Sequence, residues 1–325
     1  MTTSEILRGI QSLRALVVGD ICLDRWCTYD PSTSEPSRET GIPRLGVVAT
    51  EVTAGGGGNV AKNLAALGAG KVAALGVRGN DGFGFELDDA LREQGISTDL
   101  MVRVEQWQTF TYTKLINGQS GVEDQPRVDF ISTRPLPREA EIRIIDNLVS
   151  AIEGFDVILV ADQAETSGGG VVTPAVRDAI LGLARKHADK IFLVDSRKRI
   201  RFFRGVMIKP NRDEAEAASR ELLGTVDFAR LREHLGAKAI LMTDGARGAL
   251  VLEQEKETWA TARAVENPVD ICGAGDSFAA GAALAMAVTG DPVAAAHFGN
   301  QVASVTIMKK GTGTASPEEL LELER

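Results

Sequence analysis

The residues best suited to chemistry lie between positions 270 and 276, which read Asp-Ile-Cys-Gly-Ala-Gly-Asp and lead into the apolar segment 277–288. A helix that begins at residues 273–275 leaves its first backbone N–H groups without partners, and glycine allows an anion to approach them. Such a helix start favours phosphate or an oxyanion. Asp276 would repel that anion unless it accepts a proton there, which suggests a general base beside a phosphate. A tight loop with an ordinary first-turn carboxylate explains this segment alone equally well.

A second glycine cluster, residues 55–58, precedes Asn59 and a predicted helix over 60–67. Four glycines let the backbone come close to a ligand, and the Asn59 side chain offers both a donor and an acceptor. The alternative is a flexible turn in which Asn59 is the N-cap of the helix. The cluster therefore marks a second candidate binding segment.

A third motif, Lys209-Pro210-Asn211 followed by Glu214, lies at a predicted strand-to-helix junction. A carboxylate one turn into such a helix can hold Mg²⁺ through water beside nucleotide phosphates. A capping box, with Asn211 as N-cap and Glu214 at the third helical position, is the competing interpretation. The motif alone does not decide between the two.

A fourth motif combines Thr243, Gly245 and Gly248 after another predicted strand, where a hydroxyl and two glycines suit a phosphate or a ribose. A simple turn into the next strand is an equally good explanation. The basic run 197–204 could attract a phosphorylated substrate, although such runs are commonly solvated faces. Neither the Walker pattern nor the spaced glycine fingerprint of dinucleotide-binding proteins is present.

The elements that must position these motifs alternate between strand-like and helix-like patterns, which predicts an α/β fold with a mostly parallel sheet. We expect one domain over residues 1–325. Two long excursions, 21–53 and 104–131, interrupt the alternation, and we predict that they pair as a small β-sheet lid over one end of the main sheet. The expected strands are 15–19, 72–76, 156–161, 191–195, 206–209 and 237–243, with a hairpin over 249–253 and 258–263, and the expected helices are 174–187, 211–223, 228–235 and 276–288.

Composition excludes several classes of protein. The net charge of -9 argues against nucleic acid or an anionic membrane as the main partner. The longest apolar run, 278–288, is too short to span a bilayer, and no leader is recognisable, so we expect a cytoplasmic protein. Cys22, Cys27 and Cys272 form no metal-binding spacing, and we expect reduced thiols.

In this order the four motifs resemble those of the ribokinase-like carbohydrate kinases, the PfkB family, over nearly the whole chain. The resemblance implies a three-layer sandwich with a lid, Asp276 as the base, and ATP and Mg²⁺ as cofactors. The residues that carry it, or whose roles it implies, are Gly273, Ala274 and Gly275 as the anion hole; Lys209, Asn211, Glu214, Thr243, Gly245, Gly248 and Asn300 toward ATP and Mg²⁺; and Asp24, Gly55, Gly56, Asn59 and Arg127 toward the sugar. Asp270 is a candidate for a monovalent cation such as K⁺.

Within the family, the chain looks most similar to the heptose-7-phosphate kinase branch of lipopolysaccharide precursor synthesis. This rests on Gly19-Asp20, on Leu23-Asp24-Arg25, on Asn59-Val60-Ala61, on Arg127-Val128-Asp129-Phe130 and on Gly311-Thr312-Gly313-Thr314. The sequence departs from that branch in its four consecutive glycines, in Cys272 where threonine is common, and in residues 161–170. No nucleotidyltransferase half follows Arg325, so we expect a kinase alone.

The sequence thus predicts an ATP-dependent kinase acting on a hydroxyl of a sugar or sugar phosphate, with heptose 7-phosphate as one candidate. Another PfkB kinase, for fructose, ribose or a nucleoside, is an alternative, as is a non-catalytic sugar or nucleotide sensor on the same scaffold. A dinucleotide-dependent oxidoreductase would leave Asp276 without a role. Because a small exposed sheet has edges to protect, we also expect a homodimer formed through the lid.

Overall fold

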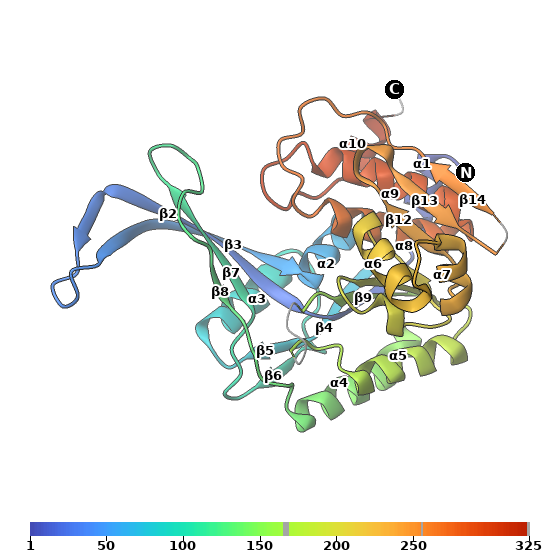
Figure 1. Ribbon diagram of the computed structural model, residues 1–325, viewed down its shortest axis with the longest axis horizontal. Coiled ribbons are helices and arrows are strands. Elements are labelled where there is room, and N and C mark those ends of the chain that lie inside the picture. The colour runs from blue at the N-terminus through green and yellow to red at the C-terminus, as the bar shows by residue number, and fades with distance from the viewer. Residues whose placement is uncertain (165–168, 255, 324–325) are drawn as a thin grey trace.

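A computed structural model describes residues 1–164, 169–254 and 256–323. Its centre is an eight-stranded sheet with the strand order β14-β13-β12-β11-β10-β9-β1-β4 (Figure 1). The parallel strands are β4 (Lys71–Leu75), β1 (Arg14–Gly19), β9 (Val157–Asp162), β10 (Ile191–Ser196), β11 (Met207–Ile208) and β12 (Ile240–Thr243), and the antiparallel strands β13 (Ala249–Leu252) and β14 (Glu257–Ala260) complete one edge. The predicted mixed, mostly parallel sheet is confirmed.

Helices cover both faces of this sheet and form the two outer layers (Figure 1). Along β1, Ala15 and Val17 pack into one core while Leu16 and Val18 pack into the other, as the alternation of side chains in a strand requires. The helices on the first face are α1 (Thr3–Ile10), α2 (Gly57–Ala66), α8 (Ala274–Thr289), α9 (Pro292–Thr306) and α10 (Pro317–Glu322); those on the second are α4 (Arg138–Ala151), α5 (Pro174–Lys186), α6 (Arg212–Leu223) and α7 (Phe228–Leu235).

The small sheet has the order β3-β2-β7-β8 and is built from the two predicted excursions. Its strands are β2 (Ile21–Pro36), β3 (Pro43–Gly56), β7 (Thr111–Asn117) and β8 (Val128–Phe130). The antiparallel β2–β3 pair extends well beyond the main body, while β2 pairs in parallel with β7 (Figure 1). Because β2 begins directly after β1, the small sheet stands beside the carboxyl edge of the main sheet.

Three further segments complete the described chain. Helix α3 (Gly82–Glu93) packs against β2 and β3 of the small sheet, and β5 (Val77–Gly79) pairs in parallel with β6 (Val102–Val104). Short 3₁₀ turns lie after α4, β10 and β12, at Ile152–Gly154, Ile200–Phe202 and Gly245–Arg247. Within the described residues, no helix combines the length and apolarity needed to cross a membrane.

One local prediction is wrong. Helix α2 begins at Gly57 rather than at residue 60, so Asn59 lies inside its first turn and Gly56, with a φ of 54°, is the N-cap. The helix begins earlier because the Gly57 N–H donates to the Asp20 carbonyl at 2.9 Å, and glycine tolerates the left-handed backbone that precedes it. This shift turns the Asn59 side chain toward the interior instead of toward its own backbone.

Candidate active site

The first turn of α8 forms the floor of the site. Its N-cap, Gly273, has a φ of 78°, and a Cβ there would lie 2.6 Å from Asn59 Nδ2, so a side chain cannot be accommodated. Geometry at a helix start leaves the N–H groups of Gly275 and Asp276 without intrahelical acceptors. The Lys209 ammonium lies beside Gly275, 3.4 Å from the position of a Cβ. This turn therefore presents bare amides and one cation to an anion.

The Asp276 carboxylate is held by two side-chain amides. Asn59 Nδ2 donates to its Oδ2 at 2.8 Å, and Gln163 Nε2 donates to its Oδ1 at 3.3 Å. Burial raises the pKa of Asp276, and the hydrogen bond from Asn59 opposes that shift. A carboxylate of raised pKa whose direction is fixed in this way is suited to accept a proton.

Two cavities meet at Asp276. The larger has a volume of about 630 Å³ and lies along the carboxyl ends of the central strands, whereas the smaller, of about 180 Å³, lies between those ends and the small sheet. Gln163, Arg197, Gly273 and Asp276 line both. The carboxylate is thus the boundary between two binding volumes.

The larger cavity contains most of the residues that the sequence assigned to ATP. Those that line it are Lys209, Asn211, Glu214, Thr243, Gly245 and Asn300, together with residues 273–276. Val265, Ile271 and Ile307 add an apolar wall to the lining. Gly248 is not among the lining residues; its φ of 93° places it tightly against β14 and Asn300. Asn300 donates to the Ala260 carbonyl at 2.7 Å, so its amide nitrogen faces the protein.

Charge in the larger cavity is balanced locally. Burial opposes the charge of Lys209, but the Asp195 carboxylate at 2.9 Å, together with Glu214 and Asp276, outweighs burial and raises the pKa of the lysine. Asn211 and Glu214 form the capping box that the sequence offered as an alternative, with Glu214 Oε2 accepting the Asn211 N–H at 2.8 Å. Burial raises the pKa of Glu214, and the Asn211 bond opposes it. The capping role is confirmed, and Glu214 still faces the cavity.

The smaller cavity is lined by Asp24 and Gly56 and by a set of cations. Arg127 reaches it as expected, and Arg25, Lys114 and Arg197 join it without having been assigned there from the sequence. Several have acidic neighbours: Arg25 pairs with Glu86 at 3.1 Å, Lys114 with Glu123 at 3.6 Å and Arg127 with Asp129 at 2.6 Å. The volume is nevertheless lined by four positive side chains.

Asp24 is largely buried beside Lys62. Burial raises the pKa of Asp24 to about 6, and the Lys62 charge opposes the shift. Gly55 lies directly against the Asp24 carboxylate, where a larger residue would collide with it. Burial also lowers the pKa of Lys62 to about 8, while its ammonium donates to Thr53 Oγ1 at 2.5 Å and to Thr312 Oγ1 at 3.2 Å.

Four residues predicted for the site line neither cavity: Gly55, Asn59, Gly248 and Asp270. Asn59 is fully buried and contacts Asp276 instead of lining the smaller cavity. Asp270 accepts the N–H groups of Cys272 at 2.9 Å and of Gly311 at 3.1 Å, which joins two loops beside the site. Among the described residues, no three His, Cys, Asp or Glu side chains come together closely enough to hold a metal ion.

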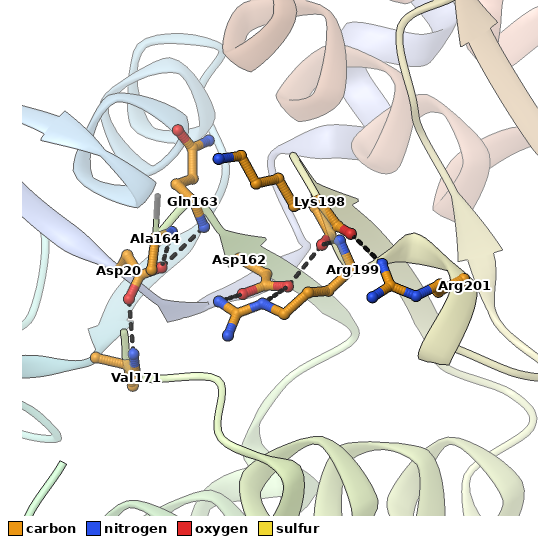
Figure 2. Close-up of polar contacts among 9 residues, drawn as sticks. Asp20, Asp162, Gln163, Ala164, Val171, Lys198, Arg199 and Arg201 are labelled. Carbon is orange, nitrogen blue, oxygen red and sulfur yellow. Dashed lines mark hydrogen bonds and ion pairs between the residues drawn. The ribbon is translucent and has the colours of Figure 1, made fainter. Parts of the chain in front are cut away.

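Sequence analysis missed Gln163 and Asp195 and gave Arg197 only as part of a charged run. All three lie at the carboxyl ends of β9 and β10, where ligands of parallel sheets bind; this placement was the available signal. Two other members of the run are structural. Arg199 pairs with the buried Asp162 (Figure 2), and Arg201 pairs with Glu221 at 3.0 Å.

The match of the chain to a family model identifies the family to which it belongs. Residues 14–319 match the model of the pfkB family carbohydrate kinases. The chain belongs to this family. Among curated proteins it is similar to the Bifunctional protein HldE of Pelobacter propionicus, with 30% identity over 323 residues that make up 97% of this chain. The chain spans 64% of the length of that relative.

Solved structures share the fold. The ribokinase of Thermotoga maritima superposes with a TM-score of 0.71 at 21% identity, covering 96% of this chain and 100% of that one. Phosphofructokinase-2 of Escherichia coli, solved in complex with potassium, gives a TM-score of 0.71 at 18% identity with the same coverage, 96% and 100%. The predicted ribokinase-like sandwich is confirmed.

Proposed function

We propose that this PfkB carbohydrate kinase transfers the γ-phosphoryl group of ATP to a hydroxyl of a sugar that already carries a phosphate. The observation that carries the proposal is the pair of cavities that share Asp276. One volume is bounded by bare helix amides and an apolar wall, and the other by a carboxylate and four cations. The single carboxylate at their boundary is suited to activate the acceptor.

The larger cavity fits a nucleoside triphosphate. Its volume of about 630 Å³ lies within the usual range of ligand sites. Lys209 and the first turn of α8 would bind phosphate oxygens, and the apolar wall of Val265, Ile271 and Ile307 would cover the base. Glu214 would hold Mg²⁺ through water, and the ion would supply charge neutralisation at the phosphates.

Each group of site residues has a separate role in the proposed reaction. Asp24 accepts hydrogen bonds from the sugar and places the reacting hydroxyl near Asp276. Asp276 takes the hydroxyl proton, held in direction by Asn59 and Gln163. The N–H groups of Gly275 and its neighbours stabilise the charge that develops on the transferred group. Closure of the small sheet as a lid would exclude water from the acceptor side.

The cationic lining favours an acceptor with an anionic group. Arg25, Lys114, Arg127 and Arg197 surround the volume that would hold the acceptor, and planar guanidinium groups suit bidentate phosphate binding. On the sequence signatures that place the chain near the heptose branch, heptose 7-phosphate is the acceptor that we propose.

Sugar-dependent ADP release tests this proposal. We expect turnover with heptose 7-phosphate, weaker turnover with fructose 6-phosphate, and little with fructose or ribose. Arg127→Gln should raise KM for the phosphorylated sugar by about 10- to 100-fold, because a charge-assisted hydrogen bond is lost, and should leave KM for fructose unchanged. Activity confined to unphosphorylated sugars would overturn the assignment of the acceptor.

We further propose the remaining properties expected from the sequence. K⁺ would bind near Asp270, a possibility supported by the potassium complex of the similar E. coli enzyme. Two copies would associate through the small sheet. A cytoplasmic location is supported by three free cysteines, of which Cys22 and Cys27 are buried as thiols.

A further inference from the structure

Asp20 is a buried carboxylate that touches neither nucleotide nor sugar volume. It follows β1 and is 1% exposed. One of its oxygens accepts the backbone N–H groups of Gln163 and Ala164, both at 2.8 Å, and the other accepts that of Val171 at 2.7 Å (Figure 2). Its own carbonyl accepts the N–H of Gly57 at 2.9 Å. A single residue therefore binds the segment after β9 and the start of α2.

The local backbone is arranged for this contact. Gly19 has a φ of 136° and lies against the Ala161 carbonyl, which brings the end of β1 close to the end of β9. Gly170 has a φ of 95°, and a Cβ there would lie 3.2 Å from Asp20 Oδ1. Burial raises the pKa of Asp20 to about 6, so at neutral pH both oxygens are acceptors.

The two segments that Asp20 binds carry the two amides that hold Asp276. Gln163 follows β9, and Asn59 is two residues beyond Gly57. Each donates to a different oxygen of the Asp276 carboxylate. Movement of either segment would turn that carboxylate.

We propose that Asp20 is a positioning residue that fixes Gln163 and Asn59, and through them the direction of the Asp276 carboxylate. This inference rests on the proposed function of Asp276 as general base. It assigns to Gln163 and Ala164, which directly follow β9, a defined part in the reaction.

A double-mutant cycle tests the coupling. Asp20→Asn replaces one acceptor oxygen with an NH₂ that faces N–H donors, and Gln163→Leu removes the amide but keeps the backbone N–H that Asp20 binds. We expect Asp20→Asn to lower kcat by about 10- to 100-fold, as misplacement of a reacting group does, with KM for ATP within about twofold of the wild-type value. The double variant should be no slower than the slower single variant, because both changes disturb one carboxylate.

Asp88→Asn is the matched control. Asp88 lies on α3 and is also buried. It pairs with Arg78 of β5 at 2.6 Å and lines neither cavity. Its replacement should lower the thermal midpoint and leave kcat unchanged. Multiplying effects of Asp20→Asn and Gln163→Leu, or a wild-type kcat for Asp20→Asn, would overturn the proposal.

Hydrogen exchange of the wild-type protein gives a test that needs no variant. The backbone amides of Gln163, Ala164 and Val171 should exchange slowly, since a buried carboxylate accepts all three. Exchange of these three amides at the rate of free peptides would refute the proposed contacts of Asp20. Wild-type protein without sugar-dependent ADP release would instead refute the proposed function, so the two failures are distinguishable.

Discussion

At the scale of residues, the site gathers carboxylates whose charges are only partly balanced. Asp24 and Asp276 both have pKa values raised by burial, and Lys62 opposes the shift at Asp24. Lys62 is the largest opposing charge at Asp24, and its ammonium also joins Thr53 of β3 to Thr312. The ionisation of Asp24, to which we assign sugar binding, should therefore respond to Lys62.

Lys62→Met should move the acidic limb of sugar binding to higher pH. In the wild-type protein, affinity for the phosphorylated sugar should fall as the pH drops through about 6, because Asp24 becomes neutral. Without Lys62 the pKa of Asp24 rises further, so the fall begins at higher pH. Calorimetric titration across pH 5–8 measures both profiles, and the titration of the ligand itself is common to both. Lys71→Met, an exposed lysine on β4, is the control, and an unmoved limb would contradict the account.

At the scale of elements, α8 positions the catalytic turn by packing against α9. Gly299 on α9 allows this approach: a Cβ there would lie 2.9 Å from the Phe278 carbonyl oxygen, which is backbone and cannot yield by a rotamer change. Residues 277–285 of α8 are buried, as the uninterrupted apolar sequence predicted. The position of the α8 turn that carries Asp276 thus depends on a close contact between two helices.

Gly299→Ala should destabilise the protein by about 1–3 kcal/mol through overpacking, even though alanine favours a helix by about 1 kcal/mol. Urea unfolding monitored by circular dichroism measures the free energy. Gly182→Ala on α5 is the control, because the nearest heavy atom to its Cβ is 3.9 Å away on the Arg185 guanidinium. That variant should be as stable as wild type or more so. Equal or greater stability of Gly299→Ala would contradict the packing described.

Most helices and strands, and the positions of the motifs on them, could be predicted from the sequence. Alternating apolar runs gave the parallel strands, and Asp227 and Gly236 marked both ends of α7. The four motifs lie at strand ends and helix starts, where local patterns are informative. Gln163, Lys114 and Arg25 could not be placed, because their position depends on strand order and on how the small sheet folds over the main one. The inward turn of Asn59 required the long-range bond between Gly57 and Asp20.

At the scale of the whole molecule, the small sheet presents an unpartnered edge. Strand β3 is its outer strand (Figure 1). It exposes Val47, Val48 and Val52, at 46%, 64% and 40% of their surfaces. Exposed edges with apolar side chains commonly pair with another chain. This supports association of two copies through β3.

Light scattering at micromolar concentration should therefore report about twice the chain mass of 34.6 kDa. The double change Val48→Glu and Val52→Glu should give monomers, since charge on both apolar positions opposes pairing. Val149→Glu, at an exposed valine on α4, should leave the dimer intact. A wild-type monomer under these conditions would refute the proposed association.

The central claim is that Asp276, at the boundary of two cavities, accepts the proton of the acceptor hydroxyl. Turnover of Asp276→Asn, with ATP binding measured in parallel, tests it most directly. General-base catalysis contributes about 10²- to 10⁴-fold, so kcat should fall by that factor. ATP should bind at least as tightly, because a negative charge beside its phosphates is gone. A variant that keeps the wild-type kcat would contradict the account.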